Sequence, residues 1–575
     1  MDERLLKPYD PKETESKIYK LWEKSGFFNP NNLPERHKEF FSIVLPPPNV
    51  TGTLHLGHAL EDSIQDMIVR YKRMAGFKTL WVPGTDHAAI ATQSKVEKLL
   101  EKEGIRKNDI GREEFLKRVK IFAQNSHDGI ISQIKKMGAS LDWSREAFTL
   151  DEKRNIAVKT AFKQMYDDGL IYRGNRMVNW DPKGQTVISD DEIVYEEKKG
   201  KFYTFKYGPF EIGTARPETK FGDKYVVIHP DDKRYKDWKH MQKITVEWIN
   251  GPIEATIIKD EMIDMGFGTG VMTITPWHSH EDFALAEKYK LDKEQIIDKY
   301  GKLLPIAGEF VGMKIGDARE KIVEKLKEKG LLVSVDENYV NRVATAERTN
   351  GIIEPQIMLQ WFVDVNKKIS ARGNKSLKEL MLEPVREGKI KIIPEHFEKV
   401  YFNWIENLRD WCISRQIWYG HRIPVWYHEP KCIPKKGKER EISKCIETIV
   451  SAEKPICKYC DALYLQDEDT LDTWFSSGLW TFSTLGWPAS VKTTAGKLEK
   501  TGDLKNYHPT TVLETGHDIL FFWIARMILM SQYLLGEIPF ENVYLHGMVR
   551  TADGKKMSKS LGDKAIDPLD IIAKY

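Results

Sequence analysis

The chain has 575 residues, a formal net charge of only +3 at neutral pH, 41% hydrophobic residues and 30% charged residues. This composition is ordinary for a globular protein, and the length predicts two to four domains. No apolar run is long enough to cross a bilayer and the first residues form no secretory segment, so we expect a cytoplasmic protein without membrane contact. Five cysteines do not make a disulfide scaffold and favour a reducing compartment. With so little net charge, any RNA binding has to come from local basic patches.

The first element predicted along the chain is a helix between Asp10 and Gly26. Asp10 is suited to the N-cap, Pro11 to the first helical position and Gly26 to the C-terminal stop. Apolar residues at helical spacing predict one buried face formed by Ile18, Leu21 and Trp22.

A strand-like run, 40–45, leads into the segment Pro46-Pro47-Pro48-Asn49-Val50-Thr51-Gly52-Thr53-Leu54-His55-Leu56-Gly57-His58. A helix is expected to follow, because apolar residues recur at helical spacing from Leu60 to Met74 and Gly76 ends the pattern. A strand, a tight turn and a helix N-terminus bind nucleotide phosphates, since free N–H groups and the helix dipole favour anions. Taken alone, the two histidines could equally be helix-capping or surface residues.

Near the other end of the chain lies the glycine-hinged basic loop Asp553-Gly554-Lys555-Lys556-Met557-Ser558-Lys559-Ser560. Lysines on a mobile loop are suited to meet charge that develops on phosphates during a reaction. Alone, such a loop is usually a solvated turn. Together and in this order, the two segments resemble the HIGH and KMSKS motifs of class I aminoacyl-tRNA synthetases.

The pattern of elements changes twice between the two motifs. After a strand at 79–83, helical patterns at 88–103, 114–137 and 153–168 favour a parallel α/β sheet with ligands at the strand ends. Segments such as 201–207, 224–228 and 243–249, rich in β-branched and aromatic residues, predict a β-rich inserted domain with helices near 281–290 and 315–329. The α/β pattern resumes with helices predicted at 399–418 and 518–536. We therefore expect a first catalytic half at 1–194, the insertion at 195–345, a second catalytic half at 346–545, and the basic loop with the start of a helical region at 546–575.

Other segments resemble the valyl-tRNA synthetases within this class. The loop Gly84-Thr85-Asp86-His87-Ala88-Ala89-Ile90-Ala91-Thr92-Gln93 is similar to theirs, as are 411–416, 471–477 and 516–523. The resemblance covers 8–575 and implies an α/β fold, in which a Rossmann-like parallel sheet of the class I type is interrupted by a β-rich editing domain. It also implies a monomer that joins valine and ATP, with Mg, into valyl-adenylate and transfers the valine to tRNA(Val).

The resemblance assigns residues to this reaction. His55 and His58 would face the phosphates, and Lys556 and Lys559 would close over them as charge develops. Contacts to ATP are implied for Gly57, Gly516, Asp518 and Lys559, and contacts to the amino acid for Pro47, Asn49, Asp86, Trp474, Ile519 and Trp523. Asp86 would anchor the ammonium of valine, although a turn-capping aspartate is the alternative. Ile519 and Trp523 are four apart, hence on one helix face, where such a pair is otherwise usually core.

An apolar pocket rejects threonine poorly, a limit for which this enzyme class is the standard example. The resemblance therefore implies hydrolytic editing of threonyl-tRNA in the inserted domain, by Thr214, Arg216, Thr219, Thr275 and Asp282. Two departures from the usual pattern are present, because many members have lysine where this chain has Thr273 and aspartate where it has Ser279. One acidic anchor, Asp282, would remain for the ammonium of the misattached amino acid.

A zinc site is predicted within 428–460. Cys457-Lys458-Tyr459-Cys460 is a zinc-type knuckle that Cys432 and Cys445 could complete, with His428 as a substitute for one sulfur. Free thiols are the alternative. Cys412, placed in the predicted helix at 399–418, is expected to be packed core.

The related enzymes continue beyond the second motif with an anticodon-binding region, so a chain that stops at Tyr575 is expected to be truncated. An isoleucine or leucine enzyme is the alternative within the class, which the loop after Gly84 disfavours. A non-catalytic RNA-binding relative is the alternative outside it. The presence of both histidines and both lysines disfavours that reading.

Overall fold

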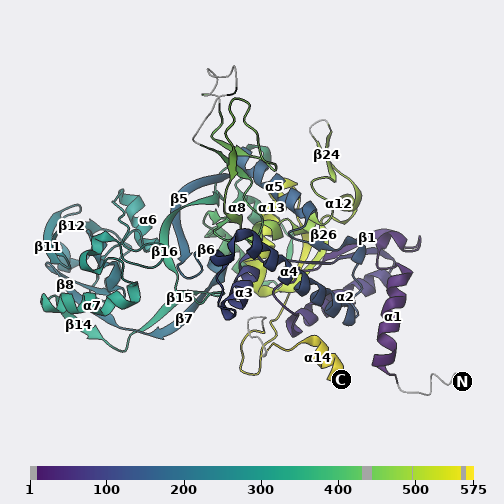
Figure 1. Cartoon of the computed structure of the whole chain (residues 1–575), viewed down its shortest axis with the longest axis horizontal. Coiled ribbons are helices and arrows are strands. Elements are labelled where there is room, and N and C mark those ends of the chain that lie inside the picture. Colours follow the sequence, from purple (N-terminus) through teal and green to yellow (C-terminus); the bar gives the residue numbers. More distant parts are fainter. Residues whose placement is uncertain are drawn as a thin grey trace. The chain divides into compact units, whose positions relative to one another are not determined.

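The computed structural model describes residues 9–429, 435, 443, 445–494, 497–557 and 565–574, in two compact units. Unit 1 comprises Met1–Tyr172 and Trp361–Tyr575, and unit 2 comprises Arg173–Gln360. The chain passes between the units along two strands, β5 (Ile171–Asp181) and β16 (Glu354–Val363) (Figure 1). Unit 2 therefore extends beyond the predicted insertion, 195–345, at both ends. None of the helices in the described ranges has the length and apolar character that a membrane span needs.

Unit 1 is built on a sheet of five strands in which every neighbouring pair is parallel. The strands are, in spatial order, β17 (Lys391–Ile393), β27 (Phe540–His546), β26 (Thr510–Gly516), β1 (Glu39–Val44) and β2 (Phe77–Val82). The two N-terminal strands lie on one side and the three C-terminal strands on the other, so the order changes direction between β1 and β26. Ligands of open α/β sheets bind beyond the carboxyl ends of the strands at such a point. The predicted parallel α/β sheet is confirmed.

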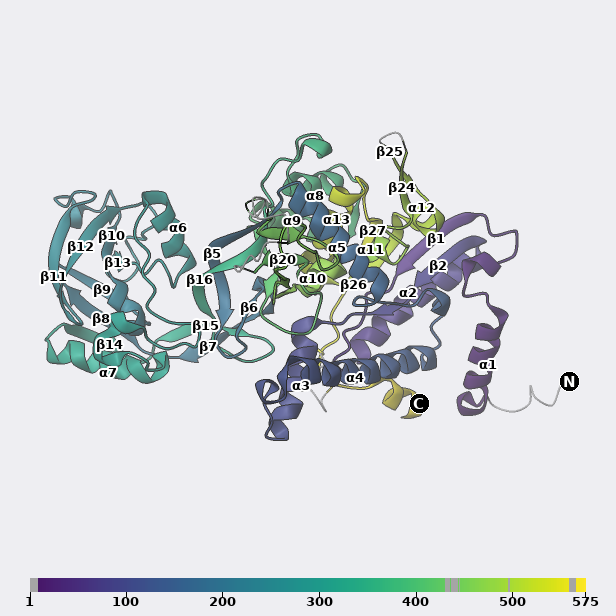
Figure 2. The same ribbon diagram turned by 45° about the horizontal axis from the view of Figure 1, so that its top comes forward.

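Both faces of this sheet are buried. Alternate residues of β1 and β2 enter two separate apolar clusters, Val44 and Val82 in one and Ile43 and Trp81 in the other. This is why the strands read as continuous apolar runs rather than as alternating patterns. Figure 2 shows α2 packed along β1 and β2. The helices of unit 1 are α1 (Pro11–Ser25), α2 (Leu56–Met74), α3 (Ala89–Lys102), α4 (Lys107–Lys136), α5 (Glu152–Asp167), α8 (Leu377–Arg386), α9 (His396–Glu406), α10 (Thr473–Ser477), α11 (Trp480–Ser483), α12 (Gly502–Tyr507), α13 (Ala525–Leu534) and α14 (Pro568–Lys574).

The helix predicted at 399–418 is wrong in its second half. α9 ends at Glu406, and the next residues form β18 (Trp411–Cys412), which pairs antiparallel with β16, and β19 (Ser414–Arg415), which pairs with β23 (Thr470–Leu471). A short apolar and aromatic run does not by itself distinguish helix from buried strand, and here the pairing partners decide. Cys412 is therefore a half-buried strand residue.

Two further expectations need correction. The segment predicted as an amphipathic helix at 518–536 begins with a 3-10 turn (His517–Ile519) and a π-helical turn (Leu520–Ile524), and α13 itself is buried nearly all round. In α1 the predicted buried face is also wrong, because Leu21 is 65% exposed whereas Tyr19 is buried. The hydroxyl of Tyr19 donates to the carbonyl of Ala139, and this polar anchor fixes the rotation of the helix.

Unit 2 is β-rich, as predicted. Its larger sheets have the orders β11-β12-β10-β13 and β14-β8-β9, and β15 pairs with β7. Two helices, α6 (His280–Tyr289) and α7 (Ile315–Glu328), accompany them. Besides the connecting strands β5 and β16, its strands are β6 (Thr186–Ile188), β7 (Ile193–Lys199), β8 (Phe202–Tyr207), β9 (Phe210–Thr214), β10 (Tyr225–Ile228), β11 (Lys243–Trp248), β12 (Gly251–Lys259), β13 (Val271–Thr273), β14 (Leu332–Asp336) and β15 (Val340–Ala346).

Candidate functional site

The N-terminus of α2 presents the two predicted histidines. His55 is the N-cap, and its Nδ1 accepts the N–H of Gly57 at 3.0 Å, while Nδ1 of His58 accepts the N–H of His55 at 3.2 Å. The helix-capping reading is therefore observed, and it uses Nδ1 of each ring. An imidazole whose Nδ1 accepts a hydrogen bond carries a proton on Nε2. A Cβ on Gly57 would lie 2.8 Å from Cε1 of His55, so any side chain here would displace the His55 ring.

The segment that follows β26 lies at the same edge of the sheet. A Cβ on Gly516 would approach Oδ1 of Asp518 to 2.7 Å and Sδ of Met548 to 3.1 Å, so a side chain there would displace the Asp518 carboxylate. Asp518 accepts a hydrogen bond from the exposed ammonium of Lys556. Asp518, predicted to contact ATP, and Lys556, predicted to close over the phosphates, are thus paired with each other in this structure. Lys559 lies outside the described residues.

Hydrogen bonds also bring the two ends of the sequence together at α2. The N–H of Leu56 donates to the carbonyl of Ile566 at 3.2 Å, and Nε2 of Gln133 donates to Oδ1 of Asp567 at 2.8 Å. The chain immediately after the basic loop is therefore attached beside the histidine motif. Within the described residues, Lys556 of the loop reaches Asp518, just beyond the end of β26.

A buried polar network under this edge was missed by sequence reasoning. The carboxylate of Glu514 on β26 accepts from Nδ1 of His546 on β27 and from Nε2 of Gln65 on α2, and Gln65 in turn accepts from the indole of Trp81. Burial, reinforced by the charge of Glu514, raises the pKa of Glu61 well above its ordinary value. The available signal was Glu514, the single charged residue of a strand whose other members are apolar residues, threonines and a glycine.

Asp86 is buried with its carboxylate held from several sides. Oδ1 accepts the N–H of Ala88 at 2.8 Å and the hydroxyl of Thr149 at 3.2 Å, and Oδ2 accepts the hydroxyl of Ser477 at 2.5 Å. Burial opposes ionisation, but hydrogen bonds from His87, Ser477 and the Ala88 N–H outweigh it and hold the pKa of Asp86 below its ordinary value. These hydrogen bonds favour the ionised carboxylate, and the turn-capping contact to Ala88 is one of them.

Other predicted amino-acid contacts lie near this carboxylate. The backbone of Asp86 pairs with the segment around Asn49. The N–H of Asp86 donates to the carbonyl of Pro48, the residue after Pro47, and the carbonyl of Asp86 accepts the N–H of Val50, both at 2.9 Å. The indole of Trp523 donates to the carbonyl of Ser477 at 3.1 Å, and the ring of Trp474 lies 6.2 Å from that of Phe522. Ile519 is half-buried against the same core. The expectation that Ile519 and Trp523 share one face of an α-helix was wrong. Ile519 lies in a 3-10 turn and Trp523 in a π-helical turn, so the α-helical spacing does not apply.

In unit 2 two of the predicted editing residues, Thr214 and Thr219, are bonded to the backbone of a third, Arg216. Its backbone N–H donates to the hydroxyl of Thr214 at 2.9 Å, and its carbonyl accepts the hydroxyl of Thr219 at 3.0 Å. The guanidinium bonds Glu354 at 2.6 Å and Glu218 at 3.1 Å. Sequence reasoning missed Glu354, which also accepts from Nδ1 of His278 at 3.1 Å.

Asp282 lies in the first turn of α6. Its Oδ2 accepts the N–H of Thr275 at 2.8 Å, and its backbone N–H donates to Ser279, the N-cap of the helix. Ser279 therefore caps the helix that carries Asp282. This is the serine noted in the sequence as standing where an aspartate was expected. Burial raises the pKa of Asp282, and the Thr275 N–H and the charge of Lys220 oppose that rise.

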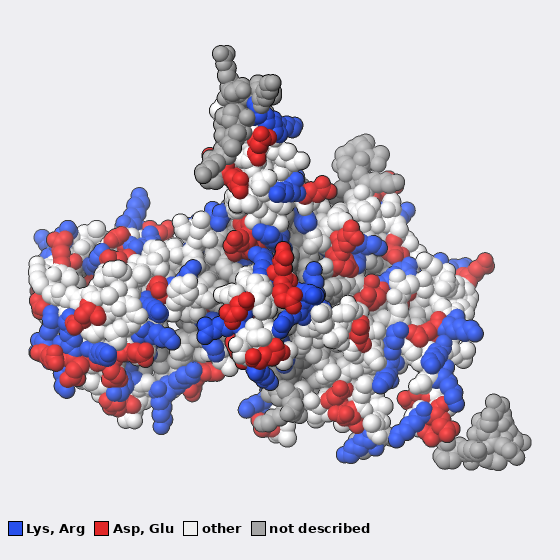
Figure 3. Space-filling model, in the orientation of Figure 1, with Lys and Arg blue, Asp and Glu red and all other residues white. Residues whose placement is uncertain are grey.

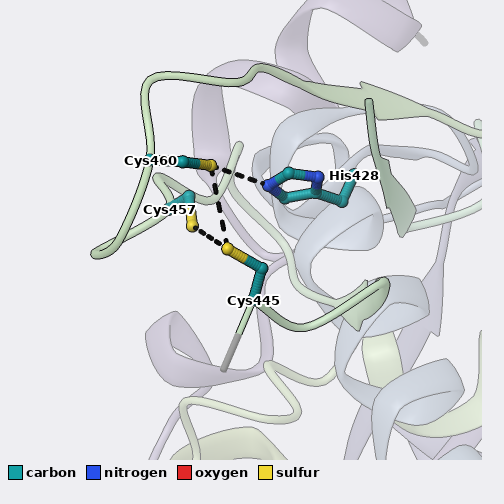
Figure 4. Close-up of side chains that lie close together, drawn as sticks. All are labelled: His428, Cys445, Cys457 and Cys460. Atoms are coloured by element: carbon teal, nitrogen blue, oxygen red, sulfur yellow. Dashed lines mark hydrogen bonds between the residues drawn. The ribbon is translucent and has the colours of Figure 1, made fainter. Parts of the chain in front are cut away.

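A cluster of metal-ligand type is formed by His428, Cys445, Cys457 and Cys460, whose ligand atoms all lie within 4.8 Å of one another (Figure 4). The sulfur of Cys445 is 3.5 Å from that of Cys457 and 3.8 Å from that of Cys460. Sulfurs in a tetrahedral zinc site with bonds of about 2.3 Å are separated by about 3.8 Å. Nδ1 of His428 lies 2.7 Å from the carbonyl of Glu429, which fixes the proton there and leaves Nε2 to bind a metal. The residues fit zinc; Cys432 lies outside the described residues.

The thiol of Cys457 has the ionisation that a metal ligand needs. Burial opposes it, but the backbone N–H groups of Tyr459 and Cys460 and the neighbouring thiols lower the pKa of Cys457 to about 6. The histidine was named from the sequence only as a substitute for one sulfur, and the structure makes it a member of the cluster.

The surface charge is mixed rather than polarised. On the face of the described residues drawn in Figure 3, lysines and arginines alternate with aspartates and glutamates. Neither sign forms a continuous field on that face. This agrees with the small net charge and leaves any nucleic-acid contact to local groups.

Comparison with known proteins identifies the class. Residues 17–575 match the family model of tRNA synthetases class I (I, L, M and V), and the chain belongs to that family. Valine--tRNA ligase of Clostridium acetobutylicum is 46% identical to it over 578 residues, which are 99% of this chain and 61% of that protein. The corresponding ligase of Thermotoga maritima is 45% identical over 575 residues, 99% of this chain and 62% of that protein. The chain thus spans about three fifths of the length of these curated relatives.

A solved complex of Agrobacterium radiobacter LeuRS with tRNA and LeuAMS aligns with 99% of this chain and 71% of that chain, at 16% identity and a TM-score of 0.49.

Proposed function

We propose that this chain activates valine with ATP, forming valyl-adenylate and pyrophosphate, as the first step of attaching valine to tRNA(Val). The observation that carries the proposal is the assembly at the carboxyl edge of β1 and β26. Asp518, just after β26, is paired with Lys556 of the basic loop. Leu56 of the histidine motif is bonded to Ile566, shortly after that loop, although the motif lies hundreds of residues earlier in the sequence. Both contacts support the proposal. Similarity to the valine ligases supports valine as the amino acid.

The proposed chemistry needs positioning more than covalent help. Asp86 binds the ammonium of valine and directs its carboxylate toward the α-phosphate for in-line attack. The Nε2–H groups of His55 and His58 donate to phosphate oxygens at the start of α2, where the helix dipole also favours anions. Lys556 exchanges Asp518 for the phosphates as pyrophosphate charge develops. Magnesium accompanies ATP as its counter-ion and neutralises part of the phosphate charge.

Hydrolytic editing of threonyl-tRNA in unit 2 is the second part of the proposal. Arg216, fixed by two carboxylates, faces the acceptor end of the tRNA in this reading, and Asp282 holds the ammonium of threonine. The metal cluster is proposed to bind a structural zinc that ties together the strand ends around His428 and the knuckle at 457–460.

The experiment that tests the proposal is pyrophosphate exchange with valine, isoleucine and threonine. We expect exchange to be fastest with valine and measurable with threonine. Faster exchange with isoleucine would assign the chain to another amino acid. Absence of exchange with every amino acid would favour a non-catalytic RNA-binding relative that keeps the fold.

A further inference from the structure

Unit 2 contains a lysine that is buried among the proposed editing residues and that sequence reasoning did not use. Lys220 lies in the 3-10 segment Pro217–Gly222, and its side chain is only 7% exposed. Its ammonium is 3.0 Å from the hydroxyl oxygen of Thr273 and 3.3 Å from Oδ1 of Asp223. A buried ammonium is costly unless it is paired, so these contacts have to be satisfied together.

The ammonium contacts one buried carboxylate, Asp223, and a second, Asp282, is bonded to the N–H of Thr275, two residues beyond the Thr273 that Lys220 touches. Asp223 is fully buried and also accepts the hydroxyl of Thr273 at 2.8 Å, while Asp282 is 7% exposed and interacts electrostatically with Lys220. Two carboxylates in one buried site cannot both stay ionised without a cation, because each disfavours the charge of the other. With Lys220 balancing Asp223, the set retains one net negative charge on Asp282.

We propose that Lys220 is a positioning residue of the editing site, which neutralises Asp223 so that Asp282 stays ionised and binds the ammonium of a misattached amino acid. The proposal rests on the editing function proposed above. The proposal also accounts for Thr273, which stands where a lysine was expected. In this chain the positive charge comes instead from Lys220, whose ammonium is 3.0 Å from the hydroxyl oxygen of Thr273.

Because Lys220 contacts Thr273, the decisive test moves the positive charge from the first position to the second. Lys220→Met keeps the apolar part of the side chain and removes the ammonium. In the double variant Lys220→Met/Thr273→Lys, the cation enters the same site from β13. The matched control is Lys224→Met, since Lys224 is 41% exposed and pairs at the surface with Asp292 and Glu294.

The assay is single-turnover hydrolysis of preformed threonyl-tRNA(Val) by excess protein. Valine-dependent pyrophosphate exchange checks that unit 1 is intact, and thermal unfolding checks that each variant is folded. Lys220→Met should slow hydrolysis by about tenfold or more, the factor that one pKa unit represents. The double variant should recover most of that loss, and Lys224→Met should match the wild type.

The pH profile separates electrostatic positioning from packing. The charged groups acting on Asp282 are Lys220 and Glu281, and Asp282 and Asp223 also repel each other's charge. Removing the cation raises the pKa of Asp282 further, so the acid limb of hydrolysis should move to higher pH in Lys220→Met and return in the double variant.

Three outcomes are decisive against the idea. If the wild type does not hydrolyse threonyl-tRNA, the editing function fails and this inference fails with it. If the wild type does and Lys220→Met hydrolyses at the same rate, only the role of Lys220 is refuted. If folded Lys220→Met is slow but the double variant gains nothing and the acid limb stays in place, Lys220 is a packing residue.

Discussion

Ser477→Ala removes one of the hydrogen bonds that hold the Asp86 carboxylate. The serine hydroxyl lies 2.5 Å from Oδ2 of Asp86, inside a site where both residues are buried. A hydrogen bond to a charged group contributes about 1.5–3 kcal/mol, which corresponds to a factor of roughly 10–150. Because that bond stabilises the ionised form, its loss raises the pKa of Asp86 toward or above the ordinary value.

The assay is valine-dependent pyrophosphate exchange over a range of valine concentrations and pH. The carboxylate is proposed to bind the ammonium in ground state and transition state alike, so KM for valine should rise by about tenfold or more with a smaller change in kcat. A depressed pKa keeps Asp86 ionised down to low pH, and activity falls as pH drops through it. Ser477→Ala should therefore move this acid limb to higher pH.

Ser476→Ala is the matched control. Ser476 is buried in the same short helix, and its hydroxyl donates to the carbonyl of Thr473 at 2.8 Å, a carbonyl that Ser477 also reaches. No hydrogen bond to Asp86 is recorded for Ser476 among the described residues, so its KM and pH profile should stay near those of the wild type. Equal effects of the two substitutions, or an unchanged KM in Ser477→Ala, would refute the assignment of Asp86 as the ammonium anchor.

Three other substitutions or treatments give clear expectations. Lys556→Ala should lower the rate of valine activation by about 2–4 kcal/mol of transition-state stabilisation while leaving valine affinity unchanged, and an effect on affinity alone would contradict its role. Elemental analysis of protein freed from unbound metal should find about one zinc per chain, and chelation should lower the unfolding temperature. Folded protein that lacks metal and whose thiols at Cys445, Cys457 and Cys460 titrate freely would contradict the zinc site. Asp282→Ala should abolish hydrolysis of threonyl-tRNA and leave valine activation intact, so hydrolysis at the wild-type rate would place the ammonium anchor elsewhere.

The parts of the site that lie in short motifs were predictable from the sequence. His55, Gly57 and His58 form a helix start whose spacing determines which groups face a phosphate, and the structure places them at the N-terminus of α2. The parallel sheet was likewise readable, because strands alternating with helices admit few arrangements. The β-rich character of unit 2 followed from its composition.

The supporting residues were not predictable, because their partners are remote in the chain. Ser477 is 391 residues from Asp86, and Gln65 is 449 residues from Glu514. No local pattern encodes such a pair; only the order of the strands brings the two members together. Lys220 gave a weaker signal, a lysine in a segment that the fold buries, which becomes meaningful only once its contact with Thr273 is known.

The miss at 399–418 has the same origin. Its apolar and aromatic residues suit a helix or a buried strand equally well, and the choice depends on β16, whose paired residues Phe362 and Val363 lie about fifty positions earlier. The spacing of apolar residues therefore predicted elements that are determined by neighbouring residues. It failed at 411–412, where pairing with the distant strand β16 determines the structure.

The central claim is that the histidine motif and the basic loop form one valine-activating site. Valine-dependent pyrophosphate exchange by the wild type, His58→Ala and Lys556→Ala tests it most directly. The account predicts exchange in the wild type, with a loss of roughly 30-fold or more in each variant, since each removes a contact to the same developing charge. Exchange that is absent from the wild type with every amino acid, or that persists undiminished in both variants, would contradict it.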